Sequence, residues 1–196
     1  MIRVAITGFG RIGRYVGKLV LDRDDMELVA VNDLVDAEQL AYLLRYDTVY
    51  GRYQSKVESR KSKVIVDGHE IAVLSEKDPE KLPWKDLDID VVVESTGRFE
   101  AREDAAKHLT AGTKAVIITA PSSSGDSPAP TVLRGVNDDA LPDDPIINAA
   151  SCTTNAIAPT IQILQDTFGI EASLMTTVHA YTATQGLVDG PGGRDY

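Results

Sequence analysis

The residues best suited to chemistry in this sequence are one cysteine and one histidine. Cys152 is the only cysteine among 196 residues and lies in AASCTTNAIAP, where an extended segment is predicted to turn into a long helix. The thiolate is the reactive form of cysteine, and a helix N-terminus lowers the pKa of a thiol. Ser151 suits the N-cap position, and Thr153 adds a hydroxyl beside the sulfur. The pattern predicts an activated nucleophile, whereas the alternative is a small, buried apolar cysteine.

His179 follows at the end of a predicted strand over residues 172–182. A strand that returns to a parallel sheet after the helix would bring this histidine beside the helix N-terminus. There it could take the thiol proton and pair with the thiolate. His69 and His108 fit structural roles instead, one in a hairpin and the other on a helix that we expect to be exposed. No histidine or cysteine cluster has the spacing of metal ligands, so we predict no metal site.

The sequence GFGRIG forms a second candidate site, because it places Gly8, Gly10 and Gly13 between a predicted strand and a predicted helix. This is the context that a dinucleotide site requires: a tight turn, a close approach of the backbone to a pyrophosphate, and close packing of the helix on the strand. Asp33 ends the next strand, where a carboxylate accepts hydrogen bonds from an adenosine ribose and repels a 2′-phosphate. The motif therefore predicts NAD rather than NADP. The alternative is a glycine-rich turn without a ligand, in which Asp33 only caps the backbone.

Strand-like and helix-like segments alternate along the chain, which favours an α/β fold with a doubly wound parallel sheet of the dinucleotide-binding (Rossmann) type. We place a domain boundary so that residues 1–150 form the nucleotide-binding domain and residues 151–196 begin a second domain of α+β type. Asp67 and Gly68 indicate a hairpin turn. Strands are predicted over 2–7, 26–32, 88–96, 114–121 and 172–182, and helices over 11–22, 36–46, 102–112 and within 147–169.

The composition limits the partners that this chain could have. Thirty acidic residues outnumber 20 basic ones, for a net charge of −10, which argues against a nucleic-acid partner. No apolar run reaches the length of a membrane helix, so we predict no membrane partner. The single cysteine fits a reducing compartment, and MIRVAITGFG does not have the pattern of a secretory signal. These features predict a cytoplasmic protein.

Seven segments in chain order resemble phosphorylating glyceraldehyde-3-phosphate dehydrogenase, and the most specific of them are NAASCTTN and TTVHAYTATQ. The other five are GFGRIGR, VND, RYDTVYGR, VVESTGRF and ITAPSSS. The resemblance implies that Cys152 is the nucleophile and His179 its base, with Ser151, Thr153 and Thr182 contacting phosphate and substrate. It also implies NAD contacts from Arg11, Ile12, Asp33, Lys77, Thr96, Gly97 and Thr119, in addition to the three glycines. Lys77 stands where many members of that family have arginine.

The resemblance further implies the reaction. The substrates would be glyceraldehyde 3-phosphate and inorganic phosphate, the intermediates a thiohemiacetal and a thioester on Cys152, and the whole protein a homotetramer. Members of that family are longer than this chain, so we expect residues 151–196 to be only the start of the catalytic domain and the chain alone to be an incomplete enzyme. Erythrose-4-phosphate dehydrogenase is an alternative within the same fold. A non-catalytic NAD-binding module, or a fragment that modulates an oligomer, is an alternative of another class.

Overall fold

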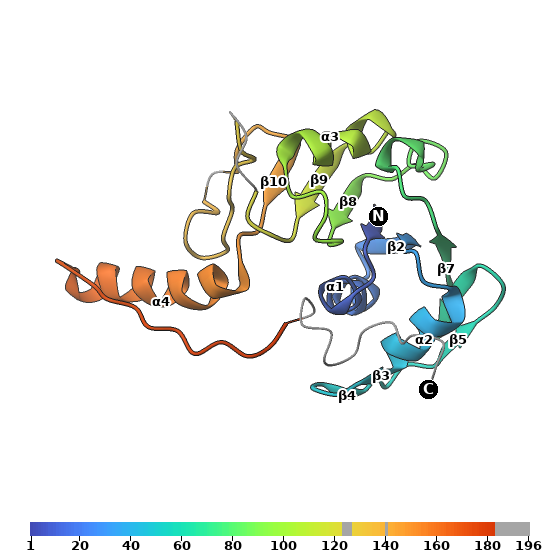
Figure 1. The fold of residues 1–196 in the computed structure, drawn as a ribbon, viewed down its shortest axis with the longest axis horizontal. Helices are drawn as coiled ribbons and strands as arrows, with labels where there is room; N and C mark the ends of the chain where they lie inside the picture. The colour runs from blue at the N-terminus through green and yellow to red at the C-terminus, as the bar shows by residue number, and fades with distance from the viewer. Residues whose placement is uncertain (123–126, 140, 183–196) are drawn as a thin grey trace.

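The computed structural model describes residues 1–122, 127–139 and 141–182. Its centre is an eight-stranded sheet with the order β10-β9-β8-β1-β2-β7-β6-β5, and a separate pair, β3 and β4, forms a small hairpin (Figure 1). The strands are β1 (Ile2–Thr7), β2 (Met26–Asn32), β3 (Tyr46–Asp47), β4 (Gly51–Arg52), β5 (Val57–Ser59), β6 (Lys63–Val66), β7 (His69–Leu74), β8 (Val91–Glu94), β9 (Ala115–Ile118) and β10 (Ile146–Asn148). The helices are α1 (Arg11–Leu21), α2 (Ala37–Arg45), α3 (Arg102–Thr110) and α4 (Cys152–Phe168), with a 3-10 turn at Pro79–Lys81.

Six neighbouring strands, from β7 through β2, β1, β8 and β9 to β10, pair in parallel. Their last residues are in register: Thr7 pairs with Asn32 on one side and with Glu94 on the other, and Ile118 pairs with both Glu94 and Asn148. Parallel strands all end at the same edge of a sheet, and this edge is where α/β proteins bind their ligands. The order of the strands therefore determines which loops can meet.

The parallel, doubly wound part of the sheet is as the sequence predicts, and the predicted hairpin adds antiparallel strands at one edge, so the whole sheet is mixed. β6 runs antiparallel to both β7 and β5 and extends the sheet beyond β7. The predicted hairpin turn forms, with Asp67 at φ 49° and Gly68 at φ 90°. Two left-handed residues in succession are typical of the tight turns that join adjacent antiparallel strands. The turn therefore makes β6 and β7 antiparallel, whereas parallel strands need a longer crossover connection.

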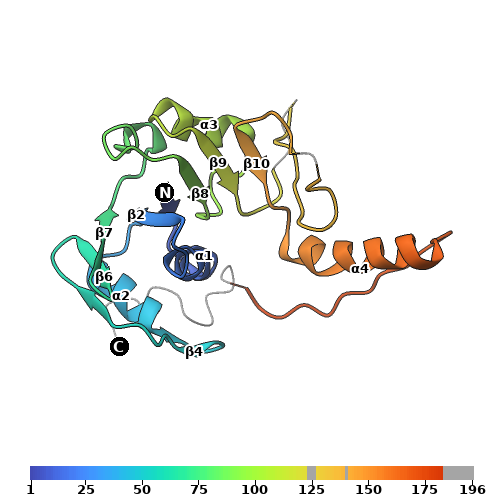
Figure 2. The ribbon, with the colours of Figure 1, turned by 180° about the vertical axis from the view of Figure 1, so that it is seen from behind.

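The helices cover both faces of the sheet, as the doubly wound prediction requires (Figures 1 and 2). Alternation along β1 divides the core: Val4 and Ile6 pack in one cluster with α1 and α2, whereas Ala5 packs on the other face with Trp84 and Val92. A third cluster lies between α3 and the β9-β10 end of the sheet. Side chains of alternating direction let one strand supply two cores.

Two helix caps follow the sequence. The Asp36 side chain accepts a hydrogen bond from Gln39 N at 2.9 Å, and Ser151 caps α4 by accepting one from Thr154 N at 3.0 Å. Gly112 follows α3 with φ 109°, a backbone conformation that favours glycine. His108 contradicts the expectation of an exposed position, because its side chain on α3 is completely buried between Trp84 and Glu94.

The segment after α4 differs from the prediction. Residues 172–182 are extended but form no strand, because no strand of the described chain lies beside them to complete a ladder of backbone hydrogen bonds. α4 projects from β10, and the segment runs back along it (Figures 1 and 2). No residue of α4 is buried, and Ile163 and Phe168 are 65% and 80% exposed. The predicted domain boundary near residue 150 remains a prediction.

Within the described residues, none of the helices combines the length and the apolarity that crossing a membrane would need.

The glycine turn generates a prediction about stability. A Cβ on Gly13 would lie 2.1 Å from the carbonyl oxygen of Gly8 and 2.9 Å from Ser95 Oγ, whereas a Cβ on Gly10 meets no atom within 4 Å. Gly13→Ala should therefore lower the free energy of unfolding by up to about 3 kcal/mol, the upper end of the cost of overpacking, and Gly10→Ala by less than about 1 kcal/mol, the cost of alanine at an N-cap. Urea denaturation measures both. Equal stabilities for the two variants would contradict the close packing of α1 on the turn.

Candidate functional site

The glycine turn between β1 and α1 is a backbone cradle. Gly8 adopts φ 77°, its N–H donates to Asn32 O at 2.8 Å, and a Cβ there would lie 2.6 Å from the backbone of Ser95 and Thr96. Gly10 is the N-cap of α1, so no side chain occupies the helix N-terminus, and the first turn carries no acidic residue. Space beside a glycine and unobstructed N–H groups at a helix start suit a pyrophosphate, so the cradle fits the predicted NAD.

Asp33 lies beside this cradle and has a structural role that the motif does not reveal. Its carboxylate accepts hydrogen bonds from Phe9 N at 2.7 Å and from Val35 N at 3.1 Å, which ties the glycine turn to the end of β2. A carboxylate has about four acceptor positions, so these two bonds leave capacity for a ribose. Asp33, which is half-buried, thus holds the glycine turn and keeps acceptor positions for the predicted ribose contact.

The structure places the other predicted cofactor residues at three positions around the carboxyl edge. Ile12, half exposed, and Arg11 lie in the first turn of α1, where Arg11 Nη1 forms an ion pair with Asp47 at 2.9 Å. Lys77 follows β7 with an exposed side chain, in a loop that Asn32 holds through two hydrogen bonds to the backbone of Glu76. Thr96, Gly97 and Thr119 follow β8 and β9, on the other side of the cradle.

The ends of β8 and β9 meet at Glu94, a residue that the sequence reasoning did not single out. The Glu94 carbonyl oxygen accepts from Thr119 N at 2.9 Å and from its Oγ1 at 3.1 Å. The carboxylate accepts from Thr96 N at 2.8 Å and from Thr7 Oγ1 at 2.5 Å. The only signal for this role in the sequence was an acidic residue inside an otherwise apolar strand.

The turn into α4 depends on two asparagines that the sequence reasoning also missed. Buried Asn148 accepts from Ala150 N at 3.0 Å and donates to Ala129 O at 2.7 Å, which supports the left-handed conformation of Ala150 at φ 58°. Asn155 Nδ2 donates to Ala149 O and to Ser151 O at 2.6 Å and 2.9 Å. Side-chain amides therefore close the turn that presents Cys152.

Cys152 and His179 meet at the start of α4. The distance from Cys152 Sγ to His179 Nε2 is 3.4 Å, and His179 Nδ1 lies 2.6 Å from the carbonyl oxygen of Ala180. A carbonyl only accepts, so Nδ1 carries a proton and Nε2 faces the sulfur. The two side chains line a groove of about 340 Å³ between α4 and residues 175–180.

Electrostatics favours charge separation in this pair. The hydrogen bond with His179 lowers the pKa of Cys152. Partial burial opposes this shift, and hydrogen bonds from the backbone and side chain of Thr153 lower the pKa further. The hydrogen bond to Ala180 and the adjacent sulfur raise the pKa of His179. Because the thiol becomes more acidic and the imidazole more basic, the proton moves toward His179 and the thiolate gains population near neutral pH.

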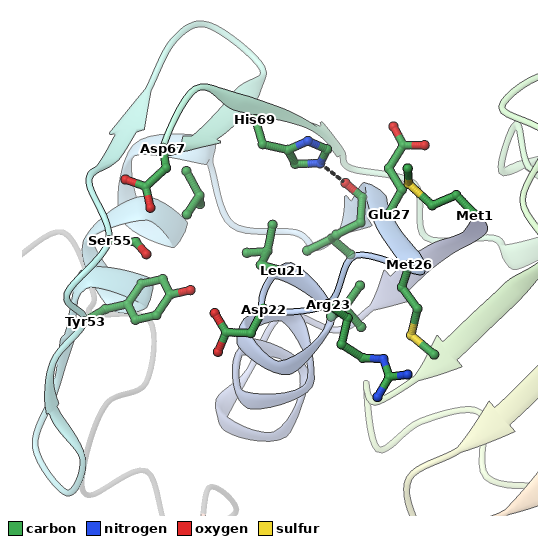
Figure 3. Close-up of a pocket in the computed structure, with 13 residues that line it drawn as sticks. Met1, Leu21, Asp22, Arg23, Met26, Glu27, Tyr53, Ser55, Asp67 and His69 are labelled. Carbon is green, nitrogen blue, oxygen red and sulfur yellow. Dashed lines mark hydrogen bonds between the residues drawn. The ribbon is translucent and has the colours of Figure 1, made fainter.

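Some predicted features are not placed or lie elsewhere. Thr182 is exposed, and the residues from 183 onward, with the end of the TTVHAYTATQ motif, lie outside the described part. A second cavity, of about 300 Å³, lies between the end of α1 and the β5–β7 region, where Tyr53, Asp67 and His69 line it (Figure 3). None of the predicted site residues lines this cavity. The described ranges contain no group of three or more His, Cys, Asp or Glu that could hold a metal ion.

Comparison with known proteins matches both parts of the chain. Residues 2–102 match the family model "Glyceraldehyde 3-phosphate dehydrogenase, NAD binding domain", and residues 151–196 match "Glyceraldehyde 3-phosphate dehydrogenase, C-terminal domain". The glyceraldehyde-3-phosphate dehydrogenase of Thermotoga maritima is 53% identical over 194 residues, which cover 97% of this chain and 57% of that protein. Glyceraldehyde-3-phosphate dehydrogenase 1 of Saccharomyces cerevisiae is 51% identical over 198 residues, which cover 100% of this chain and 58% of that protein. The chain thus spans less than two thirds of the length of these relatives.

The first family model covers the glycine cradle, Asp33 and Glu94, and the second covers Cys152 and His179. The chain therefore belongs to the glyceraldehyde-3-phosphate dehydrogenase family.

Proposed function

We propose that this chain supplies the cofactor cradle and the nucleophile for the NAD-dependent oxidation of glyceraldehyde 3-phosphate to 1,3-bisphosphoglycerate in the whole protein. The observation that carries the proposal is the 3.4 Å approach of Cys152 Sγ to His179 Nε2 at the start of α4. The helix begins four residues after β10, the last strand in the row that also ends beside the glycine cradle. The activated sulfur and the dinucleotide site thus follow strands that end at the same edge of the sheet.

The order of the strand ends gives the direction of the cofactor. Asp33, after β2, would take the adenosine ribose, and the turn after β1 would take the pyrophosphate. The remaining half of the dinucleotide then extends over the ends of β8 and β9, where Thr96 and Thr119 lie, toward Cys152 beyond β10. Adjacent strands are about 4.8 Å apart, so each step along the row moves the ligand by roughly this distance.

Cys152 and His179 then divide the chemistry. His179 Nε2 takes the thiol proton, and the thiolate attacks the aldehyde carbon to form a thiohemiacetal. The His179 imidazolium gives this proton to the alkoxide that forms, which makes the hydroxyl of the thiohemiacetal and leaves His179 neutral. His179 then takes the hydroxyl proton back as hydride leaves the carbon. Bound NAD⁺ supplies the hydride acceptor.

The resulting thioester on Cys152 is cleaved when inorganic phosphate attacks its carbonyl carbon, which releases the acyl phosphate and restores the thiolate. Thr153, together with the N–H groups of the first turn of α4, provides donors that suit anionic oxygens. Ser151 uses its Oγ to accept from Thr154 N, so its first role is to hold the helix start. Glyceraldehyde 3-phosphate, phosphate and a homotetramer are the partners that we propose for the whole protein.

Turnover tests the proposal directly. In a full-length protein that contains these residues, NADH formation should require both phosphate and glyceraldehyde 3-phosphate, and Cys152→Ser should abolish it while NAD⁺ affinity is retained. Ser151→Ala is the matched control, because it removes a cap next to the sulfur and should leave measurable turnover. Full activity of Cys152→Ser would refute the assignment of the nucleophile. Better turnover with erythrose 4-phosphate would support the alternative substrate instead.

The thiol–imidazole pair predicts a pH dependence. The alkylation of Cys152 by iodoacetamide should have a midpoint below the ordinary cysteine pKa of about 8.5, since His179 stabilises the thiolate. His179→Asn removes that partner, so the midpoint should rise and the rate at pH 7 should fall by about tenfold. His69→Asn, in the remote hairpin, is the control and should leave the rate unchanged. If both variants react alike, His179 does not activate the sulfur.

Asp33 predicts cofactor selectivity. Asp33→Asn keeps an oxygen that can accept from Phe9 N but removes the charge that repels a 2′-phosphate. The preference for NAD⁺ over NADP⁺ should fall by about tenfold, because close like charges cost more than 1 kcal/mol. Asp36→Asn loses the same charge three residues away and should preserve the preference. Calorimetric affinities for the two cofactors measure the ratio, and tight NADP⁺ binding by the wild-type chain would contradict the assignment.

A further inference from the structure

Three buried side chains form a continuous chain of hydrogen bonds behind the cofactor cradle. Trp84 is fully buried, His108 is fully buried, and Glu94 is 2% exposed. Trp84 Nε1 lies 3.1 Å from His108 Nδ1, and His108 Nε2 lies 3.2 Å from Glu94 Oε2. None of these side chains carries a role in the proposed reaction, yet buried polar networks are costly unless every member is satisfied.

The direction of this chain follows from chemistry. An indole N–H can only donate, so Nδ1 of His108 must accept and cannot carry a proton. Nε2 therefore carries the ring proton and donates it to Glu94. Trp84 thus selects one tautomer of His108, and that tautomer presents a donor to the carboxylate.

Glu94 connects His108 with Thr96 in the candidate cofactor site. Its Oε2 accepts from His108 and Thr7, and its Oε1 accepts from Thr96 N at 2.8 Å and also from the Thr96 hydroxyl. One carboxylate thereby fixes the first residues after β8 in two ways. Without His108, Oε2 would keep only Thr7 as a donor, so the carboxylate would be held less firmly and Thr96 would have a less fixed partner.

The glycine turn has additional supports that do not involve His108. Phe9 N donates to Asp33, Gly8 N donates to Asn32 O, and Ser95 Oγ donates to Gly8 O at 2.7 Å. The cradle for the pyrophosphate therefore has its own scaffold, whereas the Thr96–Gly97 segment depends on Glu94. Loss of the buried chain should affect the far half of the dinucleotide more than the adenosine half.

We propose that Trp84, His108 and Glu94 form a positioning relay that holds Thr96 and Gly97 in place for the nicotinamide half of NAD. The relay rests on the proposed function, because it assigns a specific part of that cofactor to the ends of β8 and β9. These residues do not touch the reacting atoms. They act through Thr96, so they are positioning residues rather than catalytic ones.

The test compares two ligands that differ only in the nicotinamide group. The affinities of NAD⁺ and ADP-ribose for the 196-residue chain are measured by calorimetry. His108→Phe keeps the aromatic volume and removes both hydrogen bonds, so the affinity for NAD⁺ should fall about tenfold while that for ADP-ribose changes by less than about twofold. Trp84→Phe, a milder change that removes only the indole donor, should shift the same ratio in the same direction.

Two further variants separate positioning from stability. His108→Gln retains one donor and one acceptor, so it can stand between Trp84 and Glu94 and should restore much of the NAD⁺ affinity. Ile71→Ala, in the core beneath the β6–β7 hairpin, should lower the melting temperature without changing the ratio of the two affinities. The ¹⁵N spectrum of the wild-type chain should show His108 protonated at Nε2 only.

The possible outcomes are distinct. Equal losses of NAD⁺ and ADP-ribose affinity in the His108 and Trp84 variants, or the same change of ratio in Ile71→Ala, would overturn the relay and leave the proposed function standing. A His108 ring protonated at Nδ1 would also overturn it. A wild-type chain that binds neither ligand would overturn the proposed function and the relay together.

Discussion

Parallel pairing holds six strand ends in one row, and each candidate ligand contact in the described chain depends on that row. In-register pairing places Asn32, Thr7 and Glu94 side by side, with Asn148 one strand further along beyond Ile118, although they are far apart in the sequence. All four side chains are buried and polar; Asn32, Glu94 and Asn148 hold loops by hydrogen bonds, and Thr7 bonds the Glu94 carboxylate. Because a buried polar group is costly unless it is paired, these residues keep the loops in defined conformations while the apolar clusters on both faces keep the strands together.

The row also separates the two tasks of the site in space. The glycine turn after β1 offers backbone N–H groups and no obstructing side chain, so it binds by shape and by the field of the helix N-terminus. The start of α4 beyond β10 uses the same helix-start geometry for a different purpose, because there the positive end of the helix faces a sulfur. Thr153 and His179 then add donors that stabilise the thiolate form of Cys152. In the function that we propose, one physical effect thus serves phosphate binding at one helix and nucleophile activation at another.

The long helix α4 forms without being packed against the core of the sheet. The helix is capped by Ser151 and Gly169 and contains many apolar residues, but none of its residues is buried. Pro159 lies inside the helix. The following segment forms no strand because a ladder of hydrogen bonds needs a neighbouring strand, and the described residues provide none beside it. Even so, His179 reaches Cys152, since the chain turns at Gly169 and runs back along the helix. The contact therefore depends on the path of the backbone rather than on a sheet.

The sequence by itself determined the local features: the positions of β1, β2, β8, β9 and the four helices, the turn at Asp67 and Gly68, the caps Asp36 and Ser151, and the motifs around Gly8 and Cys152. These follow from interactions between residues close in the chain, which a single sequence displays directly. Only the tertiary structure decided that His108 is buried, that Glu94 connects β1 and α3 with the segments after β8 and β9, that Asp33 binds Phe9 N, and that residues 172–182 form no strand. Each of these depends on groups brought together from distant positions. The energetic penalty for an unpaired buried polar group selects such partners, and that penalty exists only after the strands have assembled.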